Sequence, residues 1–389
     1  MSSDVLGEMF ILLLLILFSP VISRFLRIPV IVVEILLGIM LGPSGLGVLS
    51  ESEWFSAMAL MGFIYLMFVV GLEVEVSLLK ASFLKVLVIS LGAFLTPLFM
   101  GYLVALWYGL PQDIIAVALS TTSMGIILPT VREFPGRKEV AQVLLGAAIL
   151  VDIISMFALA YVVEKGFLSP GKLLLLLVSL ASFLVAVVVL KSWEPTKERI
   201  RELVGAYHLD VRTSIALIFG FSVLAEVIGV HAILGSFFAG LLVSEVQEKI
   251  EGLMDKLLSF GYGFFIPLFF IAVGVRTNLA LILGNIKAIE ILLALLLAGF
   301  LGKVLGTYVF SRISGFRAFE SLSMGFAMSA RLSLIIAAAE LGLATGILSV
   351  EIYSMLVLLA IISVLLSPIL AKMAIGKSVV RVPTENPIP

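Results

Sequence analysis

Three ionisable side chains lie inside long apolar stretches, where they could hold an ion or a proton: Asp152, Lys303 and Arg331. Asp152 is near the middle of residues 140–163 and has no charged neighbour within ten positions. A carboxylate at the centre of a bilayer is costly unless it faces water or a partner, so an intramembrane acid indicates a functional site. The alternative is a structural aspartate that hydrogen-bonds neighbouring helices.

The charges of Lys303 and Arg331 need compensation. Lys303 lies among glycines in residues 299–306 and is too central in its stretch to reach the membrane surface. It requires an anionic partner, for which Asp152 is the first candidate, or the loss of its proton. Because no second acid adjoins Asp152, we expect Lys303 to stay charged and to lean on carbonyls of broken helices or on a glutamate. Arg331 keeps its proton, and we favour a structural clamp on carbonyls of the broken helices over a direct functional role. Three glutamates lie in apolar stretches: Glu34, Glu226 and Glu340. They are possible partners for Arg331 or for one another, or they face an aqueous funnel.

Two of the apolar stretches carry polar runs near their middles. Residues 112–131 contain Ser-Thr-Thr-Ser at 120–123, and residues 319–342 contain Met-Ser-Ala-Arg-Leu-Ser at 328–333. We predict that both helices are broken there, since paired interruptions expose carbonyls and helix ends that can ligate a cation. The alternative is that the hydroxyls bond back to carbonyls of unbroken helices.

The composition places these residues in an α-helical membrane protein. Of 389 residues, 61% are hydrophobic and 13% are charged, and the mean hydropathy is +1.24. A soluble domain has about 45–50% apolar and about 25% charged residues. The net charge of −1 and the lack of a basic tract argue against a nucleic-acid partner. The sequence has no cysteine, and we find no metal-ligand cluster, phosphate loop or nucleophile–base pair, so we expect neither an enzyme nor a cofactor.

We predict about thirteen transmembrane helices. Their expected residues are 5–22, 29–42, 54–71, 82–108, 112–131, 140–163, 170–190, 211–229, 231–245, 257–274, 288–310, 319–342 and 349–371. With the N-terminus outside, nineteen of the 25 lysine and arginine residues fall on the inner side and four on the outer side. This imbalance predicts an outer N-terminus and a cytoplasmic C-terminus. The first stretch lacks the basic start and cleavage site of a signal peptide, so we expect it to be retained.

Thirteen helices divide into two sets of six that enter the membrane from opposite sides, an inverted repeat found in many secondary transporters. The pattern Phe-Ile-x-Leu-x-Phe occurs at 63–68, followed by Gly71, and again at 265–270, followed by Gly274. We therefore expect a first repeat at 1–163, a linker helix and cytoplasmic loop at 164–210, a second repeat at 211–372 and a short cytoplasmic tail at 373–389.

Several short motifs, taken in order, resemble the monovalent cation:proton antiporter-2 family, the Kef-type and NapA-like antiporters with the NhaA-type fold. They extend over residues 27 to 371 and are Arg-Ile-Pro at 27–29, Glu-Ile-Leu-Leu-Gly at 34–38, Gly-Pro-Ser at 42–44, Gly-Leu-Glu at 71–73, Leu-Gly-Ala at 145–147, Leu-Gly at 234–235, Ala-Gly at 239–240, Pro-Leu-Phe-Phe at 267–270 and Gly-Lys at 302–303. The resemblance implies crossing broken helices and a homodimer whose protomers have a dimerisation domain and a core that moves like an elevator.

The resemblance also implies roles for individual residues. Asp152 is the carboxylate that binds the cation or the proton, Thr121 and Thr122 lie near it on the first broken helix, and Lys303 matches the functional lysine of the family. We include Ser123 and Ser155 among the candidate ligands, and we assign Lys303 and Arg331 to charge compensation.

Two positions depart from the family pattern. The essential aspartate usually follows Asp, Asn or Gln, whereas Val151 precedes Asp152 here. Many members have Gly-Glu after the arginine of the second broken helix, whereas Leu332 and Ser333 follow Arg331. With valine at position 151, the site lacks a ligand or a second proton carrier. This bears on the number of protons exchanged per cation and on which cation is bound.

These features predict a Na⁺ (or K⁺)/H⁺ antiporter of the prokaryotic cell membrane. Asp152 would hold either a monovalent cation or a proton, and both loaded states would be neutral, so we expect electroneutral one-for-one exchange. Two other functions stay open: a sodium-coupled symporter for an organic anion on the same fold, and a membrane sensor that does not transport.

Overall fold

The computed structural model describes residues 2–74, 82–131, 138–163, 208–228, 231–247 and 252–379. These residues form helices and connecting turns, with no β-strand among them. Within these ranges, eight helical stretches are long and apolar enough to cross a bilayer, and Val30–Leu41, Gln112–Ile127 and Ala232–Ser244 are shorter apolar helices. The chain is therefore an all-helical polytopic membrane protein.

The chain divides into two compact units, and each unit draws on both halves of the sequence. Unit 1 comprises Met1–Val74 and Ala160–Leu279, and unit 2 comprises Glu75–Leu159 and Ala280–Pro389. The predicted boundaries, by contrast, describe repeats that follow one another along the chain. That division into repeats stays a prediction.

Unit 1 is built around two pairs of closely packed helices. Its described helices are α1 (Ser2–Leu26), α2 (Val30–Leu41), α3 (Glu53–Leu72), α11 (Leu209–Ile228), α12 (Ala232–Gln247), α13 (Leu253–Phe260), the π-helical turn η1 (Gly261–Phe265) and α14 (Ile266–Arg276). Helix α2 packs on α14, and α3 packs on α12. A Cβ on Gly38 would collide with the backbone of α14, and a Cβ on Gly71 would collide with the backbone of α12. Glycine at these two positions lets each pair of backbones approach closely.

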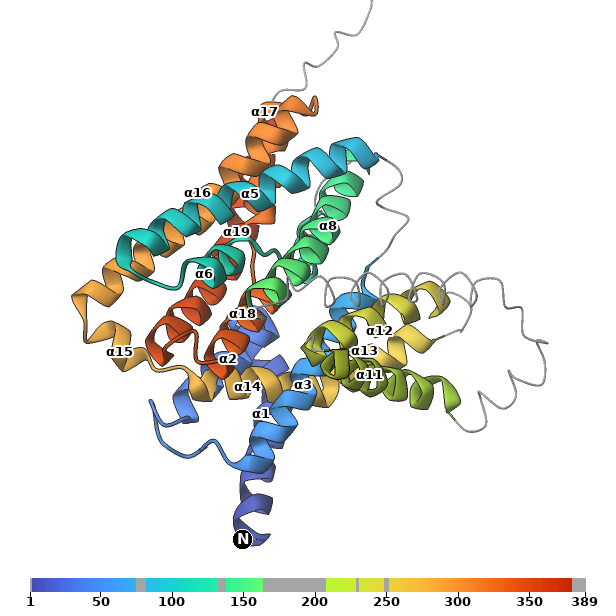
Figure 1. The fold of residues 1–389 in the computed structure, drawn as a ribbon, viewed down its shortest axis with the longest axis vertical. Coiled ribbons are helices and arrows are strands. Elements are labelled where there is room, and N and C mark those ends of the chain that lie inside the picture. Colours follow the sequence, from blue (N-terminus) through green and yellow to red (C-terminus); the bar gives the residue numbers. More distant parts are fainter. Residues whose placement is uncertain are drawn as a thin grey trace, which may run out of the picture. The chain divides into compact units, whose positions relative to one another are not determined.

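Unit 2 contains all three intramembrane ions singled out in the sequence. Its helices are α5 (Phe83–Tyr108), α6 (Gln112–Ser120), α7 (Met124–Val131), most of α8 (Lys138–Val163), α16 (Ile286–Ile313), α17 (Ala318–Met328), α18 (Ser333–Ala344) and α19 (Val350–Val379). A short helix, α15 (Leu279–Leu283), precedes α16. Helices α5 and α16 run side by side along their lengths (Figure 1).

One face of α8 forms the apolar core of unit 2. Its buried positions recur at helical spacing, at Val140, Val143, Leu144, Ala147, Ala148 and Val151. They pack with residues of α5, α7 and α17, including Phe94, Ile127 and Met324. Asp152 and Ser155 follow at the next positions of the same periodicity, so the core-facing stripe ends in a carboxylate and a hydroxyl. The apolar pattern of α8 thus fixes which way Asp152 faces.

Twelve of the thirteen predicted spans coincide with helices in the described residues, and the span at 170–190 lies outside them. The count of thirteen therefore stays a prediction. The spans at 112–131 and 319–342 are broken, as predicted, into α6 and α7 and into α17 and α18. The predicted span at 257–274 lies within a longer helical stretch that contains one irregular turn. The helix begins at Leu253 and passes through η1 before continuing to Arg276, because a π-helical turn keeps the apolar pattern while adding one residue.

Candidate ion-binding site

The first break lies at residues 121–123, between α6 and α7. Ser120 Oγ donates to the carbonyls of Ala116 and Val117, and Thr121 Oγ1 donates to the carbonyl of Ala118 at 2.9 Å. Such back-bonding takes up the carbonyls of the last turn and bends or ends a helix. Thr121 then adopts an extended backbone conformation, with φ of −62° and ψ of 166°. The break is therefore explained by the hydroxyl run that predicted it.

Hydroxyl groups at this break are buried. Thr121, Thr122 and Ser123 are each at most 5% exposed, and Ser155 on α8 is 1% exposed. The hydroxyls of Thr122 and Ser155 have no hydrogen-bond partner among the described residues. A buried polar oxygen without a partner is unusual and calls for a ligand or an ordered water. These two oxygens are the neutral groups best suited to face a cation.

The second break lies at residues 329–332, between α17 and α18, and α19 holds it. Ser329 Oγ donates to the carbonyl of Gly325 at 2.9 Å. Ser363 of α19 bonds twice to the backbone of Arg331: its hydroxyl donates to the carbonyl at 3.1 Å and accepts from the N–H at 3.2 Å. The unwound backbone is thus satisfied from a neighbouring helix, as it must be in a membrane interior.

Arg331 is fully buried and points away from its own break. One Nη donates to the carbonyl of Gly299 in α16, and its Nε has no hydrogen-bond partner among the described residues. We expected a clamp on carbonyls of the broken helices, but the accepting carbonyl belongs to the unbroken helix α16. The reason is steric: Gly299 has no side chain, and a Cβ there would lie 3.1 Å from a guanidinium nitrogen.

Lys303 connects α16 to the end of the first half-helix. It is fully buried, and Nζ donates to the carbonyl of Ser120, the last residue of α6, at 2.5 Å. This bond agrees with the expectation that Lys303 leans on a carbonyl of a broken helix, and its pairing with Asp152 stays a prediction. A helix ends in carbonyls without partners and in partial negative charge, both of which favour an ammonium. The charges of Asp152 and Arg331 nevertheless both act on Lys303.

Asp152 lies on α8 and is 5% exposed. Val151 before it is part of the apolar core, so the position that carries a polar residue in the resembling family is used here for packing. The candidate site thus draws on three segments. Asp152 comes from α8, Lys303 comes from α16, and the first break is the turn after α6. A carboxylate, hydroxyls and carbonyls are oxygen donors of the kind that bind hard cations.

The three candidate glutamates lie in different surroundings. Glu340 of α18 is 7% exposed and accepts from Tyr353 Oη of α19 at 2.6 Å. Glu34 belongs to unit 1, where it accepts from Ser19 Oγ at 3.2 Å. Glu226, also of unit 1, is exposed. Its charge acts on His231, in the turn after α11, whose pKa burial lowers. Pairing of any of them with Arg331 stays a prediction.

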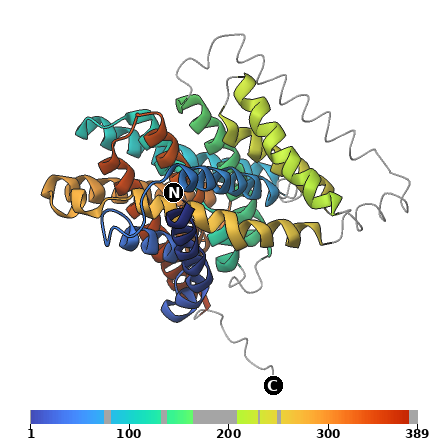
Figure 2. The ribbon, with the colours of Figure 1, turned by 90° about the horizontal axis from the view of Figure 1, so that it is seen from below.

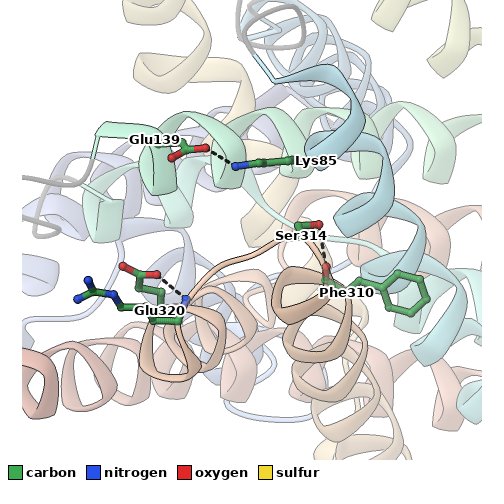
Figure 3. Close-up of polar contacts among 6 residues, drawn as sticks. Lys85, Glu139, Phe310, Ser314 and Glu320 are labelled. Carbon is green, nitrogen blue, oxygen red and sulfur yellow. Dashed lines mark hydrogen bonds and ion pairs between the residues drawn. The ribbon is translucent and has the colours of Figure 1, made fainter.

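Figure 3 shows polar contacts that lie away from both breaks, on α5, on α8 and at the start of α17. Lys85 of α5 forms an ion pair with Glu139, in the first turn of α8, at 2.5 Å. The same ammonium lies 5.2 Å from the ring centroid of Phe316, in the turn before α17. Glu320 accepts from the backbone N–H of Arg317 at 2.7 Å, which caps the start of α17. These contacts hold α5, α8 and α17 together at one end of unit 2.

Reasoning from sequence missed Tyr353 and Ser363, and it did not single out the carbonyl of Ser120 among those of the broken helices. Backbone carbonyls carry no sequence signal, so the choice of Ser120 was not predictable. Ser363 is visible only as a polar residue within the apolar span 349–371, a weak signal in a chain with many such serines.

Comparison with known proteins identifies the family. A family model described as "Sodium/hydrogen exchanger, transmembrane" matches residues 11–372. The chain is 31% identical over 370 residues to the "Probable Na(+)/H(+) antiporter 3" of Methanocaldococcus jannaschii, covering 93% of this chain and 95% of that protein. It is 30% identical over 360 residues to the "Na(+)/H(+) antiporter" of Enterococcus hirae, covering 90% and 93%.

A solved structure shares the fold. The sodium proton antiporter MjNhaP1 of Methanocaldococcus jannaschii matches 96% of this chain and 99% of its own, with a TM-score of 0.66 and 16% identity. Identity this low supports the likeness of fold alone. The family model and the two relatives extend over nearly the whole chain and both units, and on that ground the chain is a member of the sodium/hydrogen exchanger family.

Proposed function

We propose that this chain exchanges Na⁺, or K⁺, for H⁺ across the membrane, and that Asp152 binds the two ions in turn. The observation that carries the proposal is the carboxylate buried on α8, in the same unit as Lys303, which holds the carbonyl end of the first half-helix. Family membership and the names of the two relatives support sodium and protons as the transported ions.

Competition at Asp152 is sufficient to couple the two ions. An empty carboxylate in a low-dielectric barrier is costly, whereas a carboxylate loaded with a proton or a monovalent cation is nearly neutral. Only the loaded protein then changes the side to which the site opens. Because a cation and a proton exclude each other, each crossing of one ion requires the return of the other.

The hydroxyls supply the neutral part of the cation site. Thr122 and Ser155 have buried oxygens without a hydrogen-bond partner among the described residues, and Thr121 retains lone pairs after donating to Ala118. Ser123 lies in the same unwound turn. Oxygen ligands compensate the cation for its lost water, whereas a proton needs only the carboxylate.

Lys303 supports electroneutral one-for-one exchange. Its ammonium already has an acceptor in the carbonyl of Ser120, so it need not release its proton when a cation reaches Asp152. Val151 provides no second acid. The charge carried in each direction is then one.

The finer architecture belongs to the same proposal. In unit 1, Gly38 of α2 meets α14, and Gly71 of α3 meets α12. If α2 and α3 correspond to α12 and α14, these two contacts exchange under a two-fold rotation, which supports thirteen helices with two inverted repeats and the NhaA-type, Kef-related assignment. Unit 2 would be the moving core of an elevator, and unit 1 the dimerisation domain of a homodimer in a prokaryotic cell membrane. The N-terminus would be outside and the C-terminus cytoplasmic.

Proteoliposomes with an internal pH dye test the function. Adding external Na⁺ should alkalinise the lumen, because Na⁺ enters in exchange for luminal H⁺, and K⁺ and Li⁺ give the selectivity. An ionophore that sets the membrane potential should leave the final pH gradient unchanged. A gradient that follows the potential would contradict one-for-one exchange, a requirement for an organic anion would indicate a symporter, and no movement at all would indicate a sensor.

A further inference from the structure

Unit 1 contains a cavity of about 230 Å³ among α1, α3 and the segment formed by η1 and α14. All eight side chains that line it are apolar or aromatic, and they include Met9, Leu13, Ala57 and Phe264. Apolar cavities exclude water and accept apolar ligands; an engineered one of about 150 Å³ binds benzene. The cavity therefore has room for a stretch of hydrocarbon.

The π-helical turn shapes one wall of this cavity. The N–H of Ile266 reaches back to the carbonyl of Gly261, five residues earlier, so η1 holds one residue more than an α-helical turn. Within this turn, Phe264 lines the cavity and Phe265 stacks on Tyr65, with ring centroids 5.8 Å apart and planes 15° apart. π-Helical turns occur often at functional sites, and this one has no role in the proposed ion site.

A carboxylate lies at the rim of the cavity. Glu8 precedes Met9, and its Oε2 accepts from Trp54 Nε1 at 2.9 Å and from Ser52 Oγ at 3.0 Å. Trp54 itself also lines the cavity. The other oxygen, Oε1, is buried and has no hydrogen-bond partner among the described residues. A carboxylate oxygen can only accept, so this site requires a donor.

The helix beside the cavity is largely uncovered by the rest of the chain. Only 11% of the apolar part of α1 is buried within the chain, and Leu6, Phe10 and Leu17 are each more than 60% exposed. Helix α1 begins at the chain end marked N in Figure 2. An occupant that enters the cavity from the bilayer and satisfies Glu8 must combine hydrocarbon with a donor group.

We propose that this cavity binds one acyl chain of a lipid whose headgroup carries a primary ammonium, with the ammonium donating to Glu8 Oε1. An ammonium has three donors and a charge opposite to that of Glu8. A phosphatidylcholine headgroup has no N–H, and a phosphatidylglycerol headgroup has hydroxyl donors but a net negative charge that Glu8 repels. The site is independent of the proposed ion exchange.

Purified protein in lipid nanodiscs tests the proposal. Discs of phosphatidylcholine alone are compared with discs that contain phosphatidylethanolamine or phosphatidylglycerol, and the melting temperature and the lipids retained in native mass spectrometry are measured. We expect phosphatidylethanolamine to raise the melting temperature by several degrees and to be retained preferentially. The Ala57→Leu variant, which fills the cavity, should lose retained lipid of every kind. Glu8→Gln should keep an occupant but lose the preference for phosphatidylethanolamine.

Glu53→Gln is the matched control, because Glu53 is an exposed carboxylate in the first turn of α3. It should leave the lipid preference unchanged. Equal retention of all three lipids, or a preference that survives Glu8→Gln, would overturn the proposal. A change from dimer to monomer in Ala57→Leu without any change in retained lipid would assign the cavity to a second copy of the chain instead. If Ala57→Leu does not fold, Leu13→Trp fills the same cavity from α1.

Discussion

The two interrupted helices of unit 2 are held open by different groups. At the first break, hydroxyls terminate α6, and the oxygens of Thr122 and Ser155 are left without partners in the described part of the chain. At the second break, Ser363 satisfies the backbone of Arg331, whose guanidinium is directed to α16. The difference teaches that paired breaks need not share a role: the first leaves acceptors free for a ligand, and the second has its backbone groups filled by protein.

The largest effect should come from Asp152→Asn. The amide cannot exchange a proton or neutralise a cation, so we expect exchange to fall to the level of empty liposomes. The melting temperature should stay within a few degrees, because asparagine keeps the shape of the side chain. The measurement is pH-dye flux in proteoliposomes together with a melting curve in detergent.

Asp113→Asn is the matched control, since Asp113 is an exposed acid in the first turn of α6. It should retain exchange. Flux that persists in Asp152→Asn would place the ion site elsewhere. The first break would then no longer differ from the second by leaving acceptors free for the ion.

Arg331→Gln should affect stability more than any change at the first break. It removes a charged hydrogen bond to Gly299 and leaves a cavity, at a cost on the order of 3 kcal/mol. A fall in melting temperature of about 5–10 °C follows. Arg212→Gln, which changes an exposed arginine of α11, is the control and should melt like the parent. A stable Arg331→Gln protein with lost exchange would give the arginine a direct role in transport.

The double change Thr121→Val with Thr122→Val should raise the apparent KM for the cation about 3- to 10-fold, since loss of a ligand worth about 1 kcal/mol changes affinity several-fold. The maximal rate and the melting temperature should change little. Ser329→Ala provides the comparison at the second break, where the hydroxyl bonds to Gly325. Its KM should be unchanged. Equal KM values for both variants would make the hydroxyls of the first break structural.

The smallest effect should come from Ser363→Ala. Loss of its two bonds to the backbone of Arg331 costs about 1–2 kcal/mol, so we expect the melting temperature to fall by about 2–6 °C. The KM should not change, because the second break holds no ligand. Ser311→Ala, whose hydroxyl bonds only within α16, should melt close to the parent. A raised KM in Ser363→Ala would show that both breaks contact the ion.

The sequence predicts well what depends on composition and periodicity. Apolar length located twelve of the spans, and hydroxyl runs located both breaks, because back-bonding serine and threonine side chains end helices locally. The burial of Asp152 followed from its position within an apolar stretch.

What depends on backbone atoms or on distant packing was not predictable. Carbonyls of broken helices were expected as acceptors for Lys303 and Arg331. The choice of Ser120 for Lys303, and of Gly299 on the unbroken helix α16 for Arg331, has no signal in the sequence. The π-helical turn has the same apolar pattern as an α-helix, so only its backbone hydrogen bond from Ile266 to Gly261 reveals it. The two compact units also cut across the predicted repeats, since each is assembled from both halves of the chain.

The bond between Lys303 and Ser120 has a consequence for how the protein is made. The residue that caps α6 is synthesised 183 positions after the carbonyl it satisfies. A nascent chain that ends before α16 has the first half-helix without that cap, and an unsatisfied carbonyl inside a membrane is costly. The first half can therefore reach its final form only after the second half has been inserted. Biosynthesis therefore orders the two halves, because α6 receives its cap only once α16 is in place.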